Sequence, residues 1–504
     1  AVCVCSDRQM SSLLRAARLA RPTLNQHARM SSATSSGNTR SILQSIFDSS
    51  SMPSVNLTDP FPGVDTTAPQ VQTEKDVTIS TLDNGLRVAS LDNGSPLASV
   101  GVFIDAGSRY ENASINGVSH FMEQMAFKST KYRSDFKLCR EMSKLGASVS
   151  ASAGREHFIY SGDCLKEHVP HVVGTFSDVI QYHSFNDSEV AAQKKIFLEE
   201  VEKIGEAGEA QVMEDVQQAA YSNQTVGLSL YGNKDSVAQM SPELLREYAS
   251  SFFTPGRMVV AGVGVKHDEL KEHVEASFTD LPADKEDLVK AAAVYTGGDL
   301  RRHTGGPMAN YAICFETAGW QDKDLVPMCV LQMLMGGGGS FSAGGPGKGM
   351  CSRLYENVLN NYGWVENASS FNAIHDDTGL FGVTGTCPAE FVGSLAEVCT
   401  HELTGMAGEL PEVQIKRGKN QLKSAVLMQL EQRALHMEDI GRQVLTYGKV
   451  QSGADIAQQI DAVTAADIKR VASNMLNTAP SVAANGTLDS LQRYDVLAKS
   501  FGKC

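Results

Sequence analysis

The 504-residue sequence has no run of about 18 apolar residues, so it lacks the signal of a membrane-spanning helix. Its ten cysteines are scattered, with no CxxC pair and none of the density of a secreted scaffold. Zinc ribbons and disulfide-stapled folds are therefore excluded, and we expect reduced thiols. The chain is long enough for two or more domains with real cores, and we expect any membrane association to come through partners.

Acidic residues are absent from a stretch near the N-terminus. Between Met10 and Phe47 the sequence has five arginines, many serines and alanines, and no aspartate or glutamate. This composition is typical of a mitochondrial transit peptide, which we expect to span residues 1–40. A Ser-, Thr- and Pro-rich extension follows over residues 41–75. A disordered basic tail is the alternative interpretation.

Basic residues are too few to balance the acidic ones, and the formal net charge is −14. Removal of the arginine-rich predicted transit peptide makes the remaining chain more acidic still. An acidic surface is commonly a solubility device, but it also suits a basic peptide ligand better than it suits a nucleic acid. We therefore expect no nucleic-acid partner.

The sequence repeats itself weakly at a shift of 223 residues. MSPELLREYASSFF at 240–253 aligns with VTAADIKRVASNML at 463–476, and Ser241 and Thr464 are each placed to cap a helix. β-prone runs alternate with amphipathic helical stretches in both halves. The pattern predicts an α+β domain that is present twice.

The stretch SHFMEQ at 119–124 is one side chain short of a zinc motif. In the inverted motif HxxEH, two histidines one helical turn apart hold the ion, and the glutamate activates a bound water. Here His120 and Glu123 are present, but Gln124 stands where the second histidine would be. An amide oxygen is a poor zinc donor, so we expect no metal to be held. The alternative is an active zinc peptidase in which Gln124 or a nearby group completes the site.

Residues 103–130, FIDAGSRYENASINGVSHFMEQMAFKST, resemble the motif region of the pitrilysin-type metallopeptidases. MAFKST is similar to their mitochondrial branch, the processing peptidases and the core proteins of respiratory complex III. The resemblance implies that each half, 76–290 and 298–504, is a mixed, mainly antiparallel sheet packed with helices. In zinc-binding members a glutamate 76 positions after the second histidine is the third ligand, and counting from Gln124 gives Glu200.

The resemblance thus implies the remnant of a metal site, with no metal and no catalytic residue in this chain. The second half offers no replacement, because Gln332 and Met335 align with the histidine and glutamate of the motif. The remnant comprises His120, Glu123, Gln124 and Glu200.

Residues 336–350, GGGGSFSAGGPGKGM, contain eight glycines in fifteen positions. Glycine loses much backbone entropy on ordering and has no side chain to pack, so we expect a loop without regular helix or strand. A phosphate cradle would need Ser or Thr after Lys348, where Gly349 stands, so nucleotide binding is not favoured. A passive linker and a functional lid remain as interpretations.

A glycine-rich lid can adapt its backbone to peptides of many sequences. The loop resembles the glycine-rich segment of the α subunits of the processing peptidases, which implies that it contacts presequences. The substrate-binding residues predicted in this way are Gly336, Gly337, Gly338, Gly339, Ser340, Phe341, Gly344, Gly345, Gly347, Lys348 and Gly349.

The resemblance implies a substrate-recognition chain that pairs with a zinc-bearing β subunit and binds basic presequence peptides. Zinc is expected in that partner, and the place of action would be the mitochondrial matrix or the matrix side of the inner membrane. The alternative is a purely structural core protein of the cytochrome bc1 complex, and one chain can serve both roles. Arg417 and Arg442 are candidates for an interface or for substrate contact.

Overall fold

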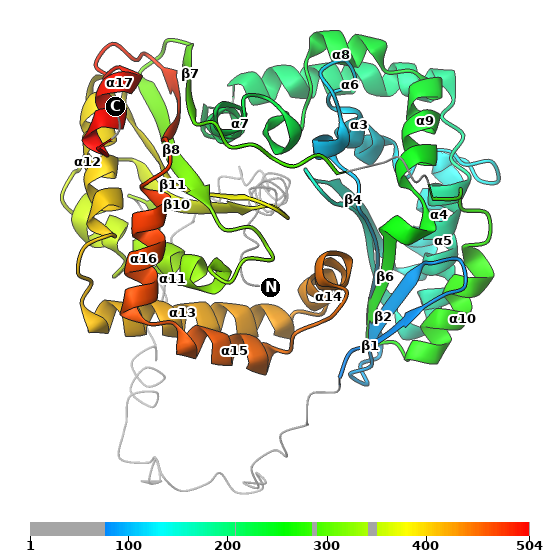
Figure 1. The fold of residues 1–504 in the computed structure, drawn as a ribbon. Helices are drawn as coiled ribbons and strands as arrows, with labels where there is room; N and C mark the ends of the chain where they lie inside the picture. The colour runs from blue at the N-terminus through cyan, green and yellow to red at the C-terminus, as the bar shows by residue number, and fades with distance from the viewer. Residues whose placement is uncertain (1–75, 207, 285–289, 341–349, 503–504) are drawn as a thin grey trace, which may run out of the picture. The chain divides into compact units, whose positions relative to one another are not determined.

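The computed structural model describes residues 76–206, 208–284, 290–340 and 350–502. The predicted transit peptide and the extension after it lie outside these residues. The described residues all belong to one unit of the chain, and they form two six-stranded sheets with helices on their faces (Figure 1). This arrangement confirms the predicted α+β class with two related halves. None of the described helices is long and apolar enough to cross a bilayer.

The first sheet has the strand order β1-β2-β6-β3-β5-β4, and only the β2–β6 pair is parallel. Its strands are β1 (Thr78–Thr81), β2 (Arg87–Leu91), β3 (Leu97–Ile104), β4 (Ser148–Ala153), β5 (Phe158–Leu165) and β6 (Met258–Val263). The helices of the first half are α3 (Val118–Met125), α4 (Asp135–Leu145), α5 (Val169–Gln181), α6 (Asp187–Glu206), α7 (Gly208–Ala220), α8 (Lys234–Gln239), α9 (Pro242–Phe252) and α10 (His267–Ser277).

The second sheet has the order β7-β12-β8-β11-β10-β9, and only the β7–β12 pair is parallel. Its strands are β7 (Gly298–His303), β8 (Met308–Thr317), β9 (Gly337–Gly339), β10 (Asn367–Ile374), β11 (Gly379–Pro388) and β12 (Ser481–Gly486). The helices of the second half are α11 (Leu325–Met335), α12 (Val392–Gly405), α13 (Glu412–Glu431), α14 (Arg433–Tyr447), α15 (Gly453–Ala462), α16 (Ala465–Met475) and α17 (Tyr494–Ser500).

Five strands occupy the same order in the two sheets, β2-β6-β3-β5-β4 in the first and β7-β12-β8-β11-β10 in the second. The shift of 223 residues carries Pro242, which begins α9, onto Ala465, which begins α16. The hydroxyls of Ser241 and Thr464 each accept a backbone N–H in the first turn of these helices, at 3.2 Å. The repeat and both caps predicted from the sequence are therefore confirmed.

Each sheet is buried on both faces, which explains why its central strands are nearly continuous apolar runs. In β3, Val100 and Val102 enter the core shared with α3, α5, α9 and α10, whereas Phe103 points to the opposite face. In β8, Ile313 enters the core of the second half, whereas Cys314 points to the opposite face.

The opposite face of each sheet is covered by a helix from the other half. Met437, Ile440 and Val444 of α14 pack on β3 and β6 of the first sheet. Val212 and Val216 of α7 pack on β8 and β12 of the second sheet. The 223-residue shift superposes α7 on α14, so the exchange is reciprocal (Figure 1). The sequence pattern did not predict this exchange.

The contact of α14 with the first sheet is close because two glycines remove side chains from it. A Cβ atom at Gly441 would lie 2.2 Å from Phe103 Cε2, and one at Gly101 would lie 2.6 Å from Met437 Sδ. Arg87 of β2 donates from Nη1 to Val444 O at 2.9 Å, near the carbonyl end of α14 where a cation is favoured. The helix is thus fixed along its length.

A buried ion network joins the two halves a second time. Arg109 donates to Glu156 at 2.6 Å and to both carboxylate oxygens of Asp377, at 2.7 and 2.6 Å. Lys290 lies 3.2 Å from Glu156. Burial alone would raise the pKa of Glu156, but its hydrogen bond with His375 and the charges around it hold that pKa well below its usual value. Removing one member of such a network typically costs about 3–5 kcal/mol.

Substituting Gly441→Ala should lower the free energy of unfolding by about 2 kcal/mol, because the added methyl group must displace Phe103. Gly174→Ala in α5 is the matched control. No atom lies within 4 Å of its Cβ position, so it should be neutral or stabilising by up to about 1 kcal/mol. Urea denaturation followed by circular dichroism measures both. Equal midpoints for the two variants would contradict the close packing of α14.

Candidate functional site

The motif residues lie on α3, whose start is organised by a buried carboxylate. Gly117 precedes the helix with φ +88°, a conformation that glycine adopts readily. Glu111 accepts the backbone N–H of Gly117 at 2.6 Å and that of Ser119 at 2.8 Å. These first-turn donors have no partner within the helix, so the carboxylate satisfies them and orients the motif.

His120 is buried at the centre of the motif. Its Nδ1 lies 2.9 Å from Glu123 Oε2, and its Nε2 lies 3.5 Å from Glu200 Oε1. The ring packs against Tyr231 and Phe197, with centroids 5.1 and 5.4 Å away. The structure therefore brings together, from α3 and α6, the histidine and both glutamates that the sequence singled out.

Gln124 occupies the remaining position through hydrogen bonds of its own. Its Nε2 donates to Glu200 Oε2, and its Oε1 accepts from Gln193 Nε2 at 2.6 Å. A carboxylate only accepts hydrogen bonds, so the amide nitrogen, which has no lone pair to offer a metal, must face Glu200. The glutamine thus joins the two helices directly.

The residues present do not fit a zinc ion. A zinc site needs donors with free lone pairs, typically three from the protein at a catalytic centre. The amide of Gln124 presents N–H groups to Glu200, and Glu123 Oε2 also accepts the backbone N–H of Ala153 at 2.9 Å. Among the described residues, no group of three or more His, Cys, Asp or Glu side chains is arranged to hold a metal. In the second half, Gln332 and Met335 lie on α11 as aligned.

The glycine-rich segment begins with a strand, which corrects the expectation of a loop without regular structure. Gly337–Gly339 form β9 and pair with β10 at the edge of the second sheet. The sheet edge supplies hydrogen bonds that an isolated glycine run lacks, so β9 needs no side chains of its own. Gly337 has φ +113°, and its Cβ atom would lie 2.1 Å from Ala368 O, so only glycine fits there.

The two ends of the glycine-rich segment are tied together. Gly337 N donates to Ser352 Oγ at 3.1 Å, and Tyr355 Oη donates to Gly339 O at 3.1 Å. Arg417 of α13, one of the two arginines noted in the sequence, donates to Cys351 O. Gly336–Gly339 and Ser340 are thus placed by the structure. The other predicted binding residues, Phe341, Gly344, Gly345, Gly347, Lys348 and Gly349, lie outside the described residues.

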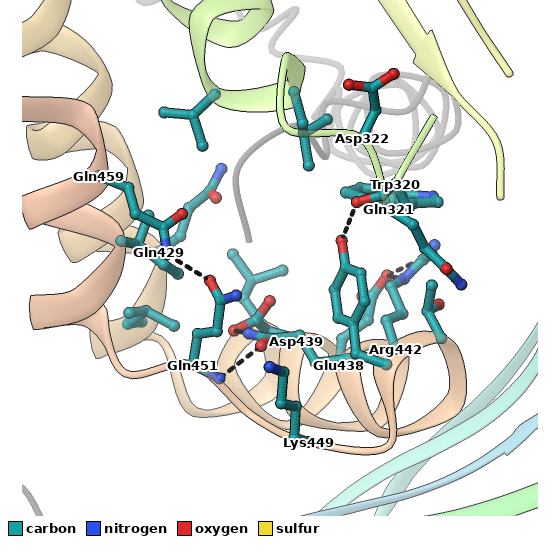
Figure 2. A pocket seen from close by; sticks show the side chains of 18 of the residues that line it. Trp320, Gln321, Asp322, Gln429, Glu438, Asp439, Arg442, Lys449, Gln451 and Gln459 are labelled. Carbon is teal, nitrogen blue, oxygen red and sulfur yellow. Dashed lines mark hydrogen bonds and ion pairs between the residues drawn. The ribbon is translucent and has the colours of Figure 1, made fainter. Parts of the chain in front are cut away.

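A cavity of about 500 Å³ lies between α14, α15, the end of α13 and the segment that follows β8 (Figure 2). Its wall contains five glutamines, three carboxylates and three basic side chains. Trp320 lies on one side. Its carbonyl oxygen accepts a hydrogen bond from Tyr447 Oη at 2.7 Å. Gln429, Gln451 and Gln459 gather on the other side.

The charges of the cavity are partly used within its wall. Glu438 Oε1 accepts from Arg442 Nε and Nη2 at 3.0 and 2.8 Å, and Asp439 accepts from Gln443 at 2.8 Å. Within the described part of the chain, Glu438 Oε2 accepts no hydrogen bond and can receive one from a ligand. His157, the cavity residue from the first half, has its pKa lowered to about 4 by burial and by the charge of Arg442, so it is neutral at pH 7.

Sequence reasoning noted Arg442 but did not find this cavity. The signal was present in α14, where apolar residues 437, 440 and 444 alternate at helical spacing with polar residues 438, 439, 442 and 443. The sequence pattern of a helix with one apolar face and one polar, functional face is the same as that of an ordinary surface helix. Only the exchange of α14 between the halves shows that its polar face lines a cavity.

Comparison with known families accounts for both halves. Residues 87–234 match the model of the insulinases, peptidase family M16, and residues 239–422 match the model of the M16 inactive domain. The chain belongs to the insulinase family. The second match begins before β6, yet β6 lies between β2 and β3 of the first sheet, so the match boundary does not coincide with the boundary between the sheets.

Three relatives of this insulinase-family chain are named as alpha subunits of the mitochondrial-processing peptidase. It is 39% identical to mitochondrial-processing peptidase subunit alpha of Solanum tuberosum, over 84% of both chains. It is 38% identical to the probable mitochondrial-processing peptidase subunit alpha-1 of Arabidopsis thaliana, over 92% of this chain and 91% of the relative. It is 35% identical to the alpha subunit of Homo sapiens, over 88% of this chain and 89% of the relative.

The Gln124→His substitution should create zinc affinity in this insulinase-family chain. It would restore two histidines one turn apart beside Glu200, and it would remove the amide that faces that carboxylate. Metal analysis after dialysis against zinc measures the gain, and Gln124→Leu is the matched control without a donor. Stoichiometric zinc in the unsubstituted chain would contradict the conclusion that Gln124 prevents the motif from holding zinc.

Proposed function

We propose that this chain is the non-catalytic, substrate-recognition subunit of a mitochondrial processing peptidase. It holds the presequences of imported precursors while a zinc-bearing β subunit cleaves them. The observation that carries this proposal is the amide of Gln124, which fills the second-histidine position of an otherwise retained motif and bonds to Glu200. The names of the relatives point to the same role.

Several surfaces support peptide binding. β4 is the last strand of the first sheet, its side chains are Ser, Val and Ala, and its end contacts Glu123. An extended peptide can add to such an edge through backbone hydrogen bonds. The anchored start of the glycine-rich segment at β9 offers a second backbone surface. Both suit substrates whose sequences vary.

The cavity beside α14 supports selection of basic residues. The cavity wall contains the carboxylates of Glu438 and Asp439 and the aromatic residues Trp320 and Tyr447, and a guanidinium group can bond to the former and stack on the latter. The acidic net charge of the chain would attract a basic peptide before contact. We place this activity in the matrix or at the matrix face of the inner membrane.

Reconstitution with a zinc-bearing β subunit tests the proposal. The isolated chain should not cleave a presequence peptide, and the complex should. The Gly337→Ala variant should lose about tenfold in kcat/KM, because its methyl group displaces β9 from Ala368. Gly363→Ala, outside the glycine-rich segment, is the control, since no atom lies within 4 Å of its Cβ position. Cleavage by the isolated chain would contradict the proposal. Equal activity of the two variants would contradict the proposed role of the glycine-rich segment in substrate binding.

The Glu438→Gln variant should raise KM for an arginine-rich presequence about tenfold while kcat changes little, because one charge-assisted hydrogen bond is lost. The amide oxygen can still accept from Arg442, so the helix should keep its position. Glu409→Gln, at an exposed position, is the control. A peptide with its arginines replaced by glutamines should not distinguish the three proteins. Unchanged KM for the basic peptide would remove Glu438 from substrate binding.

A further inference from the structure

A cluster of basic residues stands out on this acidic chain. Residues 128–147 contain six lysines and arginines and two acidic residues, whereas the whole chain has a formal charge of −14. The segment forms a short loop and then α4, which contacts β4 of the first sheet. It is outside the site described above.

The helix α4 has one buried and one basic face. Leu138 and Met142 are buried in the first half of the chain. On the opposite face, Phe136, Arg140 and Lys144 follow one another at intervals of four residues, so their side chains lie in one row. All three residues are exposed. Within the described part of the chain, Arg140 and Lys144 form no ion pair.

Aromatic side chains lie among these basic groups. Phe136 is 73% exposed and Tyr132 is 59% exposed, which makes them the two most exposed aromatic side chains of the described residues. The Tyr132 ring contacts the Tyr182 ring at 5.1 Å, and Lys131 Nζ lies 5.4 Å from its centroid. Exposed apolar side chains that gather within a polar rim are typical of an interaction site.

The loop that presents Tyr132 is held from beneath. Arg133 donates from Nε to Asp178 at 2.7 Å and from Nη1 to Glu141 at 3.0 Å. The Thr130 hydroxyl also donates to Asp178, at 2.8 Å. Arg133 therefore has a structural role in this segment. It pairs with Glu141, which is one of the two acidic residues of the segment. The exposure of Tyr132 is a property of an ordered loop.

We propose that Lys131, Tyr132, Phe136, Lys137, Arg140 and Lys144, here called the basic aromatic face, dock the protein on an anionic lipid bilayer. Aromatic rings are favoured at the level of the headgroups, and lysine and arginine are attracted to acidic phospholipids. The acidic groups near this face are Asp135, Glu141 and Asp280. Glu141 is paired with Arg133 and also with Lys137 of the face itself, and Asp280 accepts from the Tyr182 hydroxyl.

The composition of this face favours a bilayer over a protein partner. A stable protein interface buries a contiguous, well-packed core, from which lysine is generally depleted. Here two rings stand among four long basic side chains, a pattern typical of interfacial membrane binding. This docking is independent of the proposed peptidase role, and it would give a chain without a spanning helix among its described residues a direct route to the membrane surface.

Vesicle sedimentation of the full chain tests the docking. The protein should sediment with vesicles of phosphatidylserine and phosphatidylcholine in equal parts and not with phosphatidylcholine alone, and salt should weaken the binding. The Arg140→Glu/Lys144→Glu variant should bind at least tenfold more weakly, since each basic residue near an anionic surface contributes about fivefold. Phe136→Ser should weaken binding severalfold at any salt concentration.

Two matched controls keep the test specific. Lys195→Glu/Lys203→Glu reverses two exposed charges on α6, and Ile196→Ser removes a 55% exposed apolar side chain there. Both should bind vesicles almost as well as the unsubstituted chain. Equal losses in the control and test variants would overturn the proposal, as would absence of binding to anionic vesicles. Loss of association with a β subunit in the Arg140→Glu/Lys144→Glu variant, with vesicle binding intact, would assign the face to a protein partner instead.

Discussion

The close packing of α14 on the first sheet is the contact on which the rest of the structure depends. The packing depends on two glycines. Gly441 of the helix leaves room for Phe103 of the sheet, and Gly101 of the sheet leaves room for Met437 of the helix. The helix belongs to the second half by sequence, so this contact joins the halves, and α7 makes the equivalent contact in the other direction. With its apolar side buried on β3 and β6, α14 must turn Glu438, Asp439 and Arg442 to the cavity. The apolar face of α14 thus joins the two halves, and its polar face lines the cavity.

The motif helix carries Gln124 where a zinc motif would have its second histidine, and side-chain hydrogen bonds hold that position. A buried histidine between two glutamates would be costly if the groups lacked partners. Gln124 bonds to Glu200 and Gln193, so it links α3 to α6 through side-chain hydrogen bonds. The backbone N–H of Ala153 engages Glu123 as well. These hydrogen bonds hold the cluster together. They also occupy carboxylate oxygens of Glu123 and Glu200 that a zinc ion would need as donors.

Much of this organisation could be predicted from the sequence. The repeat, the two helix caps and the proximity of Glu200 to the motif follow from short patterns and from a resemblance. Three features could not be predicted, because they depend on contacts between distant segments. These are the exchange of α7 and α14, the cavity lined by Glu438, and the strand β9. Glycines 337–339 lack any intrinsic preference for a strand, and it is the free edge of β10 that orders them. The basic aromatic face was likewise hidden, because periodicity alone does not tell an exposed Phe136 from a buried one.

The central claim is that this chain holds a presequence but does not cut it and needs no metal to hold it. The most direct measurement is the equilibrium binding of a fluorescent presequence peptide to the isolated chain, with and without a zinc chelator, followed by analysis of the recovered peptide. The account predicts the same affinity in both conditions and an intact peptide. Binding that disappears with the chelator, or a peptide recovered in cleaved form, would contradict it.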